Sequence, residues 1–258
     1  MTGFLDPGLV ALLGAGFWHG AIVFLRVSTM VSVLPAFGEQ LVPVHVRLAL
    51  ALAFTFVVAP AVPALGVPQS VGGFGLYVFT ETIVGLALGI GVRFFFHALQ
   101  TAGSIAAQST SLAQMLGGAG IDPMPAVGAV MFWAGAALAM ILGLHIHAAE
   151  FMIYSYQLFP AGQFLDAGML SEWGVARVSR SFALAFTMAA PFVIGAVIYN
   201  LTLGIINRAM PQLMVAMVGA PVVTFGGLVI LMVGIPMILN TWSEALFGFF
   251  ANPGGALQ

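Results

Sequence analysis

Long apolar runs separated by short breaks dominate the chain. Six runs are long enough, or nearly so, to cross a bilayer, which takes roughly 20 apolar residues; they cover residues 9–34, 48–66, 74–97, 126–159, 181–206 and 213–250. The breaks are rich in Pro, Gly and polar residues, which is typical of turns. The runs 126–159 and 213–250 exceed one crossing, so we expect them to tilt or bend, with Pro236 a natural kink point. The pattern predicts an all-α integral membrane protein of about six bent apolar helices, organised as one polytopic domain over residues 1–258.

The composition supports this class and excludes others. Of the 258 residues, 61% are hydrophobic and 5% are charged, with a mean hydropathy of +1.12, whereas a soluble domain carries about 25% charged residues. A net charge of −2 with six scattered arginines excludes a basic nucleic-acid-binding face. Because the chain has no cysteine, disulfides and thiolate metal sites are impossible. The N-terminal stretch lacks a positively charged region, so we expect the first apolar run to remain in the mature protein.

A polar stripe follows the third apolar run. If residues 100–111 are helical, four uncharged polar side chains at offsets 0, 4, 8 and 11 share one face: Gln100, Ser104, Gln108 and Ser111. The flanking positions are mostly alanine and glycine, which neither fill a core nor favour lipid. This chemistry suits a wet but electrically neutral lining, so these four residues are candidate channel-lining positions.

A glycine-rich segment comes directly after the stripe. It consists of Met115, Leu116, Gly117, Gly118, Ala119 and Gly120. Three glycines in four residues do not favour a helix, and irregular backbone in a membrane protein is tolerated where it is buried in protein or lines a water-filled cavity. The residues alone leave two interpretations open, a pore-side plug and an ordinary exposed loop.

Two charged residues interrupt the apolar runs, Arg26 in the first and Glu81 in the third. Charges at such positions are costly, and they are usually paired, snorkelling to the interface or facing a cavity. The sequence leaves open whether Arg26 snorkels or forms a buried ion pair, for which Glu81 is the nearest candidate.

A second polar group occurs in the motif LHIHAAEF, which contains two histidines and a carboxylate. On a helix His145 and His147 point about 160° apart, so only His147 and Glu150 share a face. This spacing favours a hydrogen-bonded or channel-rim cluster over a metal or catalytic site. We therefore predict no catalytic residues, no metal site and no cofactor.

Small residues recur at four-residue spacing, which lets helix backbones approach closely in lipid. The pairs are Gly16 and Gly20, Gly85 and Gly89, and Gly135 and Ala139. Ordinary packing within the chain and a dedicated subunit contact both explain such pairs.

These landmarks together resemble the FliR/SctT family of type III export-gate membrane proteins, over nearly the whole length. The residues that match the family's spacing are Arg26, Pro35, Phe37, Pro43, Arg47, Pro60, Glu81, Gly85, Gly89, Gly103 and Gln108. The motifs IDP at 121–123 and LHIHAAEFMIYSYQLFPAG follow, and the most recognisable signature is Asn207-Arg208-x-x-Pro211-Gln212 with Gly219 and Pro221. Met214 departs from the family, which often has asparagine at that position.

The resemblance implies an architecture and partners. One such subunit joins several FliP-like and FliQ-like subunits in a closed helical assembly, beside an FlhB-like export protein, in the bacterial inner membrane at the flagellar basal body. It implies a FliP-like part over about residues 1–180 and a FliQ-like hairpin over 181–258, and it makes residues 115–120 the plug of a closed channel. It also places residues 207–212 at the hairpin turn. There Asn207 and Arg208 cap the preceding helix, Pro211 begins the next one and Gln212 faces the cytoplasmic mouth. A turn that needs only to be polar also accounts for Gln212.

Two functions follow as hypotheses. The first is a non-enzymatic channel subunit that passes unfolded flagellar proteins, contacts lipid and draws energy from partners, since the chain has no phosphate-binding loop of the G-x-x-x-x-G-K-[ST] type. The second is a secondary transporter or permease for a small solute, with an intramembrane Arg/Glu/His site. Paired, broken helices that would indicate a transporter are not visible in the sequence, which favours the first hypothesis. Overall likeness favours a flagellum over an injectisome.

Overall fold

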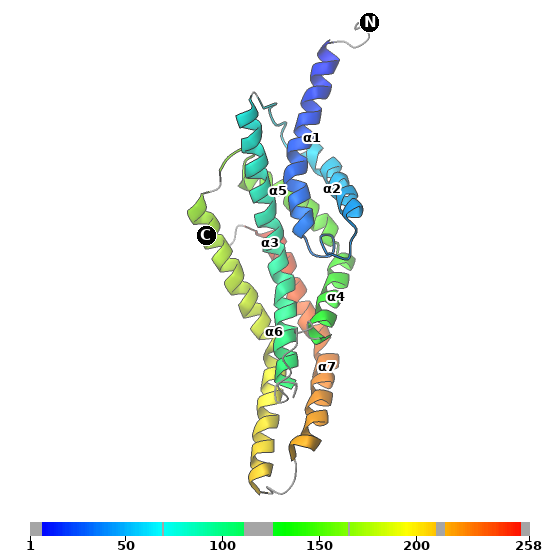
Figure 1. Cartoon of the computed structure of the whole chain (residues 1–258), viewed down its shortest axis with the longest axis vertical. Helices are drawn as coiled ribbons and strands as arrows, with labels where there is room; N and C mark the ends of the chain where they lie inside the picture. Colours follow the sequence, from blue (N-terminus) through cyan, green and yellow to red (C-terminus); the bar gives the residue numbers. More distant parts are fainter. Residues whose placement is uncertain (1–6, 69, 111–125, 165, 210–214, 254–258) are drawn as a thin grey trace. The chain divides into compact units, whose positions relative to one another are not determined.

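The structure is a computed structural model that describes residues 7–68, 70–110, 126–164, 166–209 and 215–253. Its elements are α1 (Pro7–Val33), α2 (Val44–Val58), the short 3₁₀ helix η1 (Ala59–Ala61), α3 (Val71–Thr110), α4 (Ala126–Ile141), α5 (Leu144–Leu158), α6 (Ala167–Ala209) and α7 (Val215–Ala251) (Figure 1). The described residues contain no strand. Within the described residues, five helices are long and apolar enough to cross a membrane, and α4 with α5, which are bent by 75° at their junction, would make a sixth if the pair is one span. The all-α membrane fold predicted from the apolar runs is therefore confirmed.

Some helix boundaries differ from the expected ones. The third apolar run and the polar stripe belong to one 40-residue helix, α3. The run 126–159 is divided at Gly143, whose positive φ of 86° ends the α4 geometry and is a conformation that glycine adopts without strain. Helix α7 continues through Pro236 as one element. The break between the apolar runs 126–159 and 181–206 is shorter than those runs predict, because α6 begins at Ala167.

The early start of α6 has a local cause in Asp166. Its carboxylate oxygen Oδ1 accepts the backbone N–H of Met169 at 2.8 Å. This is the hydrogen bond of an N-cap residue, which satisfies one of the N–H groups left without a partner at a helix start. An aspartate inside a glycine-containing break therefore initiates a helix here.

The described helices contribute to two compact units. The first contains Met1–Arg93, Gly143–Ala176 and Gly248–Gln258, and the second contains Phe94–Leu142 and Arg177–Phe247. This division by contacts does not test the likeness of residues 1–180 and 181–258 to other subunits, which stays a prediction.

In the first unit α1 packs against α2 and against the first half of α3. A Cβ at Gly85 would collide with the Arg26 carbonyl oxygen, and a Cβ at Gly89 would lie 3.0 Å from the Met30 carbonyl oxygen. The glycine pair on α3 thus brings two helix backbones into close contact within the chain. By contrast, Gly16 and Gly20 on α1 have no atom within 4 Å of a Cβ position.

The imidazole of His19 joins α1 to the connection between α2 and α3. Its Nδ1 accepts the Leu65 backbone N–H at 3.1 Å, so the ring hydrogen lies on Nε2, which donates to the Ala59 carbonyl at 2.8 Å. Both polar atoms of the ring therefore bond to backbone groups of the segment between α2 and α3.

In the second unit the far half of α3 packs between α4 and α7. The Phe96 ring lies 5.7 Å from Phe132 and 5.0 Å from Trp242, both edge-on, and the Trp242 indole N–H donates to the Phe95 carbonyl at 2.8 Å. A Cβ at Gly103 would collide with the Gly128 backbone, so these two helices also meet at glycine. One face of the second half of α3, the part that carries the polar stripe, is thus buried in the core of this unit.

Candidate functional site: a polar helix segment and a buried ion pair

Arg26 of α1 and Glu81 of α3 form an ion pair in the core of the first unit. The Arg26 Nε lies 2.7 Å from Glu81 Oε2, and both side chains are 0% exposed. The structure thus settles the alternative left open by the sequence, because Arg26 pairs with Glu81 and does not snorkel to an interface. An ion pair at this depth persists only where further hydrogen bonds satisfy the remaining polar atoms.

Those further bonds come from the end of α5 and the turn after it. Arg26 Nη1 donates to the Ser155 hydroxyl at 3.1 Å, and Nη2 donates to the Phe159 carbonyl at 2.9 Å. The guanidinium also lies 3.8 Å from the centre of the Tyr156 ring, a cation–π geometry. The other carboxylate oxygen of Glu81 accepts the Gly162 N–H at 3.1 Å. The two charged side chains therefore also bond to the last turn of α5 and to the connection between α5 and α6.

The ion pair of Arg26 and Glu81 fixes the α5–α6 connection, and we call this pair the clamp. Phe159 follows the last helical residue of α5, where carbonyl groups lack intrahelical partners and a cation is favoured. Gly162 has a φ of 73°, and a Cβ there would lie 2.8 Å from the Tyr77 ring, so this turn requires glycine. Sequence reasoning did not find these partners, because their separation from Arg26 gives no local signal.

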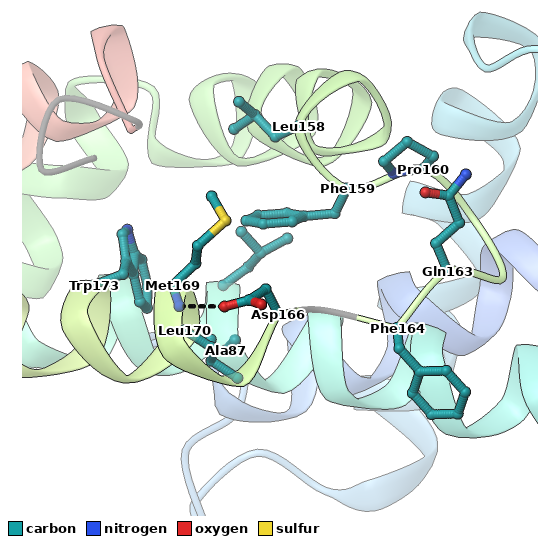
Figure 2. Close-up of a pocket in the computed structure, with 11 residues that line it drawn as sticks. Ala87, Leu158, Phe159, Pro160, Gln163, Phe164, Asp166, Met169, Leu170 and Trp173 are labelled. Carbon is teal, nitrogen blue, oxygen red and sulfur yellow. Dashed lines mark hydrogen bonds between the residues drawn. The ribbon is translucent and has the colours of Figure 1, made fainter. Parts of the chain in front are cut away.

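A cavity of about 180 Å³ is lined in part by Phe159, whose carbonyl accepts from Arg26. Figure 2 shows the residues that line it. Its lining is mainly apolar and includes Leu158, Phe159, Met169 and Trp173, while Gln163 and Asp166 contribute polar groups. Asp166 already accepts the Met169 N–H, shown dashed in Figure 2. Part of the cavity wall thus belongs to the connection that Arg26 and Glu81 bond to.

The polar stripe lies on the less packed face of α3 in the second unit. Gln100 and Ser104 are half-buried and Gln108 is exposed, whereas Ala102 and Ala106 on the other face are 1% exposed each. The Gln100 side-chain oxygen lies 2.9 Å from His97 Nδ1. His97 is exposed and extends the polar face by one turn, a position the sequence reasoning missed although its spacing could have revealed it.

Several predicted residues lie outside the described ranges. These are Ser111, the glycine-rich segment Met115, Leu116, Gly117, Gly118, Ala119 and Gly120, and the turn residues Pro211 and Gln212. Asn207 and Arg208 fall in the last turn of α6, where Arg208 is exposed and its positive charge suits the helix C-terminus.

The histidine group has the geometry expected from its spacing. His147 Nδ1 lies 3.3 Å from Glu150 Oε2, three residues along α5, and His145 is exposed on a different side of the helix. Among the described residues, no group of three His, Asp or Glu side chains is placed to hold a metal ion.

Comparison with known proteins gives a consistent result across most of the chain. The profile of the family described as "Bacterial export proteins, family 1" matches residues 17–248. The chain is 31% identical over 228 residues to the flagellar biosynthetic protein FliR of Caulobacter vibrioides, covering 87% of this chain and 91% of that protein. It is 30% identical to the FliR protein of Aquifex aeolicus, covering 88% and 89% of the two chains. Against the FliR protein of Escherichia coli the identity is 28%, covering 92% and 89%.

Proposed function

The chain belongs to the bacterial export proteins of family 1, and on that premise we propose that it is a channel subunit of the flagellar type III export gate. In this proposal it lies in the bacterial inner membrane at the flagellar basal body, assembles with FliP-like and FliQ-like subunits beside an FlhB-like protein, and passes unfolded flagellar proteins. It catalyses no reaction and takes no cofactor. The similarity to FliR proteins over almost the full length of both chains supports the flagellar assignment.

One observation supports the channel role above the others. A single helix, α3, is mainly apolar along its first half, where Glu81 is buried in an ion pair, and carries three uncharged polar side chains on one face of its second half, of which Gln108 is exposed and Gln100 and Ser104 are half-buried. Amide and hydroxyl groups that face lipid find no hydrogen-bond partner in the surrounding hydrocarbon. They suit a passage for unfolded polypeptide, because they can bond to backbone groups without selecting a charge.

The glycine-rich segment follows this helix directly, so we assign residues 115–120 as the plug of the closed channel. The turn residues Asn207, Arg208, Pro211 and Gln212 belong, on the same proposal, to the cytoplasmic end of the α6–α7 hairpin. This end would meet substrate before the stripe does.

The buried charges weigh against the alternative, a small-solute transporter. Such a site needs ionisable groups that a transported ion can reach, facing a cavity. Arg26 and Glu81 are fully buried and bonded to each other and to the α5–α6 connection. Their role within the fold accounts for both charges without a transported ion.

Two experiments test the proposal. In a strain made non-motile by the loss of its own FliR protein, expression of this chain should restore swimming and should yield a stable protein only when FliP-like and FliQ-like subunits are present. Deletion of Gly117–Gly120 should leave assembly intact and make the gate leak ions, measured as loss of membrane potential on induction. A control with serine at these four positions keeps the segment length and should leak less. An ion-tight, normally assembled deletion variant would show that this segment is not the plug.

A further inference from the structure

The groove between α1 and α2 is apolar apart from one imidazole. Its lining comes from α1, α2, η1 and the start of α3, and its large side chains are Phe17, Trp18, Phe24, Leu52, Phe56 and Phe74. Among the described residues that line the groove, His19 is the one titratable side chain. It is half-buried, so both nitrogen atoms of its ring need hydrogen-bond partners.

The backbone of the connection between α2 and α3 supplies both partners. The Leu65 N–H donates to His19 Nδ1 at 3.1 Å, and Nε2 donates to the Ala59 carbonyl at 2.8 Å. This pattern requires the neutral ring, because a nitrogen that carries a proton cannot accept a hydrogen bond. A proton added to Nδ1 would face the Leu65 N–H, which is also a donor, so this hydrogen bond must break.

No carboxylate of the described residues pairs with His19 to compensate the charge that such a proton adds. The ionisable side chains of the elements that line the groove are Arg26 on α1, His45 and Arg47 on α2, and Tyr77, Glu81, Arg93 and His97 on α3. Arg26 and Glu81 bind each other. His45 and Arg47 lie in the first turns of α2, about 18–21 Å along the helix from Ala59. Tyr77 packs against the turn at Gly162, Arg93 and His97 lie farther along α3, and the segment 59–68 contains no ionisable side chain.

We propose that His19 is a proton-sensitive link between α1 and the α2–α3 connection. The neutral ring holds the connection, and a ring that gains a proton releases Leu65, so the link is complete at higher pH and is lost as the pH falls. Histidine is the side chain whose charge ordinarily changes between about pH 5 and 8. Because the connection leads into α3, the helix that carries Glu81 and the polar stripe, acidification frees the segment before this helix. The link lies within the first unit, so it does not rest on the proposed function.

Hydrogen exchange of the Leu65 amide, which is the donor in this link, tests the proposal in the full-length chain in detergent. Exchange rates at about pH 7.5 and about pH 5 are each divided by the rate of an unprotected amide at the same pH. In the parent this corrected rate should rise roughly tenfold or more on acidification, since the acceptor is lost. The Phe159 amide, which is bonded to the Ser155 carbonyl, should keep its protection and serves as the internal control.

Two substitutions of His19 separate the effect of the proton from the effect of the side chain. His19→Gln can form both hydrogen bonds without titrating, so Leu65 should stay protected at both pH values. His19→Phe cannot accept a hydrogen bond, so Leu65 should exchange fast at both. If His19→Gln does not hold the connection, it should behave like His19→Phe, and the parent should still change from slow exchange to the rate of the phenylalanine variant.

Three results would overturn the proposal. The first is equal protection of Leu65 in the parent at both pH values. The second is a rise of the same size in His19→Phe, which has no proton to gain at this position. The third is a simultaneous loss of protection at Phe159, which would assign the change to general unfolding and not to the His19 link.

Discussion

Replacing Arg26 and Glu81 singly and together tests whether the ion pair clamps the first unit. Arg26→Ala leaves the Glu81 carboxylate buried with one remaining donor, the Gly162 N–H. Glu81→Ala leaves the guanidinium with the Ser155 hydroxyl and the Phe159 carbonyl but no counter-charge. The double variant leaves no uncompensated buried charge.

The magnitudes follow from full burial at a 2.7 Å separation. Removing one partner of a buried pair costs about 3–5 kcal/mol, since the other charge stays desolvated. The loss in free energy of unfolding in the double variant should be smaller than the sum of the two single losses by about 2–3 kcal/mol. This difference is near the upper end of the coupling energies of directly contacting residues. Arg93 and Glu39 give a matched control, because that pair is longer at 3.5 Å and 31% and 17% exposed, and its coupling should stay below about 1 kcal/mol.

The assay is thermal unfolding of the detergent-solubilised gate, followed by tryptophan fluorescence for the parent, both single variants and the double variant. About 1 kcal/mol shifts the midpoint by roughly 2–4 °C in a domain of this size, so each single variant should melt roughly 6–20 °C lower. Additive losses within about 0.5 kcal/mol would show that the two charges act independently, and the clamp would have to be abandoned.

Three further substitutions have defined expectations in the same unfolding assay. Tyr156→Phe should be neutral or stabilise by about 1 kcal/mol, because its buried hydroxyl has no hydrogen-bond partner among the described residues. His19→Gln can keep both hydrogen bonds to the α2–α3 connection and should melt near the parent, whereas His19→Phe should lose about 1 kcal/mol per bond. Equal losses in the two His19 variants would exclude the bridging role of this side chain. Gly103→Leu should destabilise by about 1–3 kcal/mol, since its side chain has no room at the Gly128 backbone, while Gly204→Ala, with no atom within 4 Å, should be tolerated.

Much of the helical architecture was predictable because hydropathy is a property of consecutive residues. Each apolar run fell on one or two helices, and the offsets of Gln100, Ser104 and Gln108 predicted the shared face that α3 shows. Charge within apolar runs was also informative, since a buried Arg26 needs a counter-charge and few were available.

The rest could not be predicted, because it depends on contacts between distant segments. Ser155 and Phe159 lie 129 and 133 residues from Arg26, and no local pattern indicates that they satisfy its guanidinium. The start of α6 was misplaced since a capping aspartate looks like any other polar residue in a break. The division at Gly143 was expected only as a bend somewhere in an overlong run, because several glycines in it could have served.

The most direct test of the channel role uses the absence of cysteine from the chain. Gln108→Cys, on the exposed face of α3, is combined with a flagellar export substrate that carries one cysteine and is stalled during passage. Ala106→Cys, on the buried face of the same helix, is the control. If the polar segment lines the passage, position 108 forms a disulfide with the stalled substrate and position 106 does not. If position 108 never couples to a substrate that demonstrably occupies the gate, this helix face does not border the route.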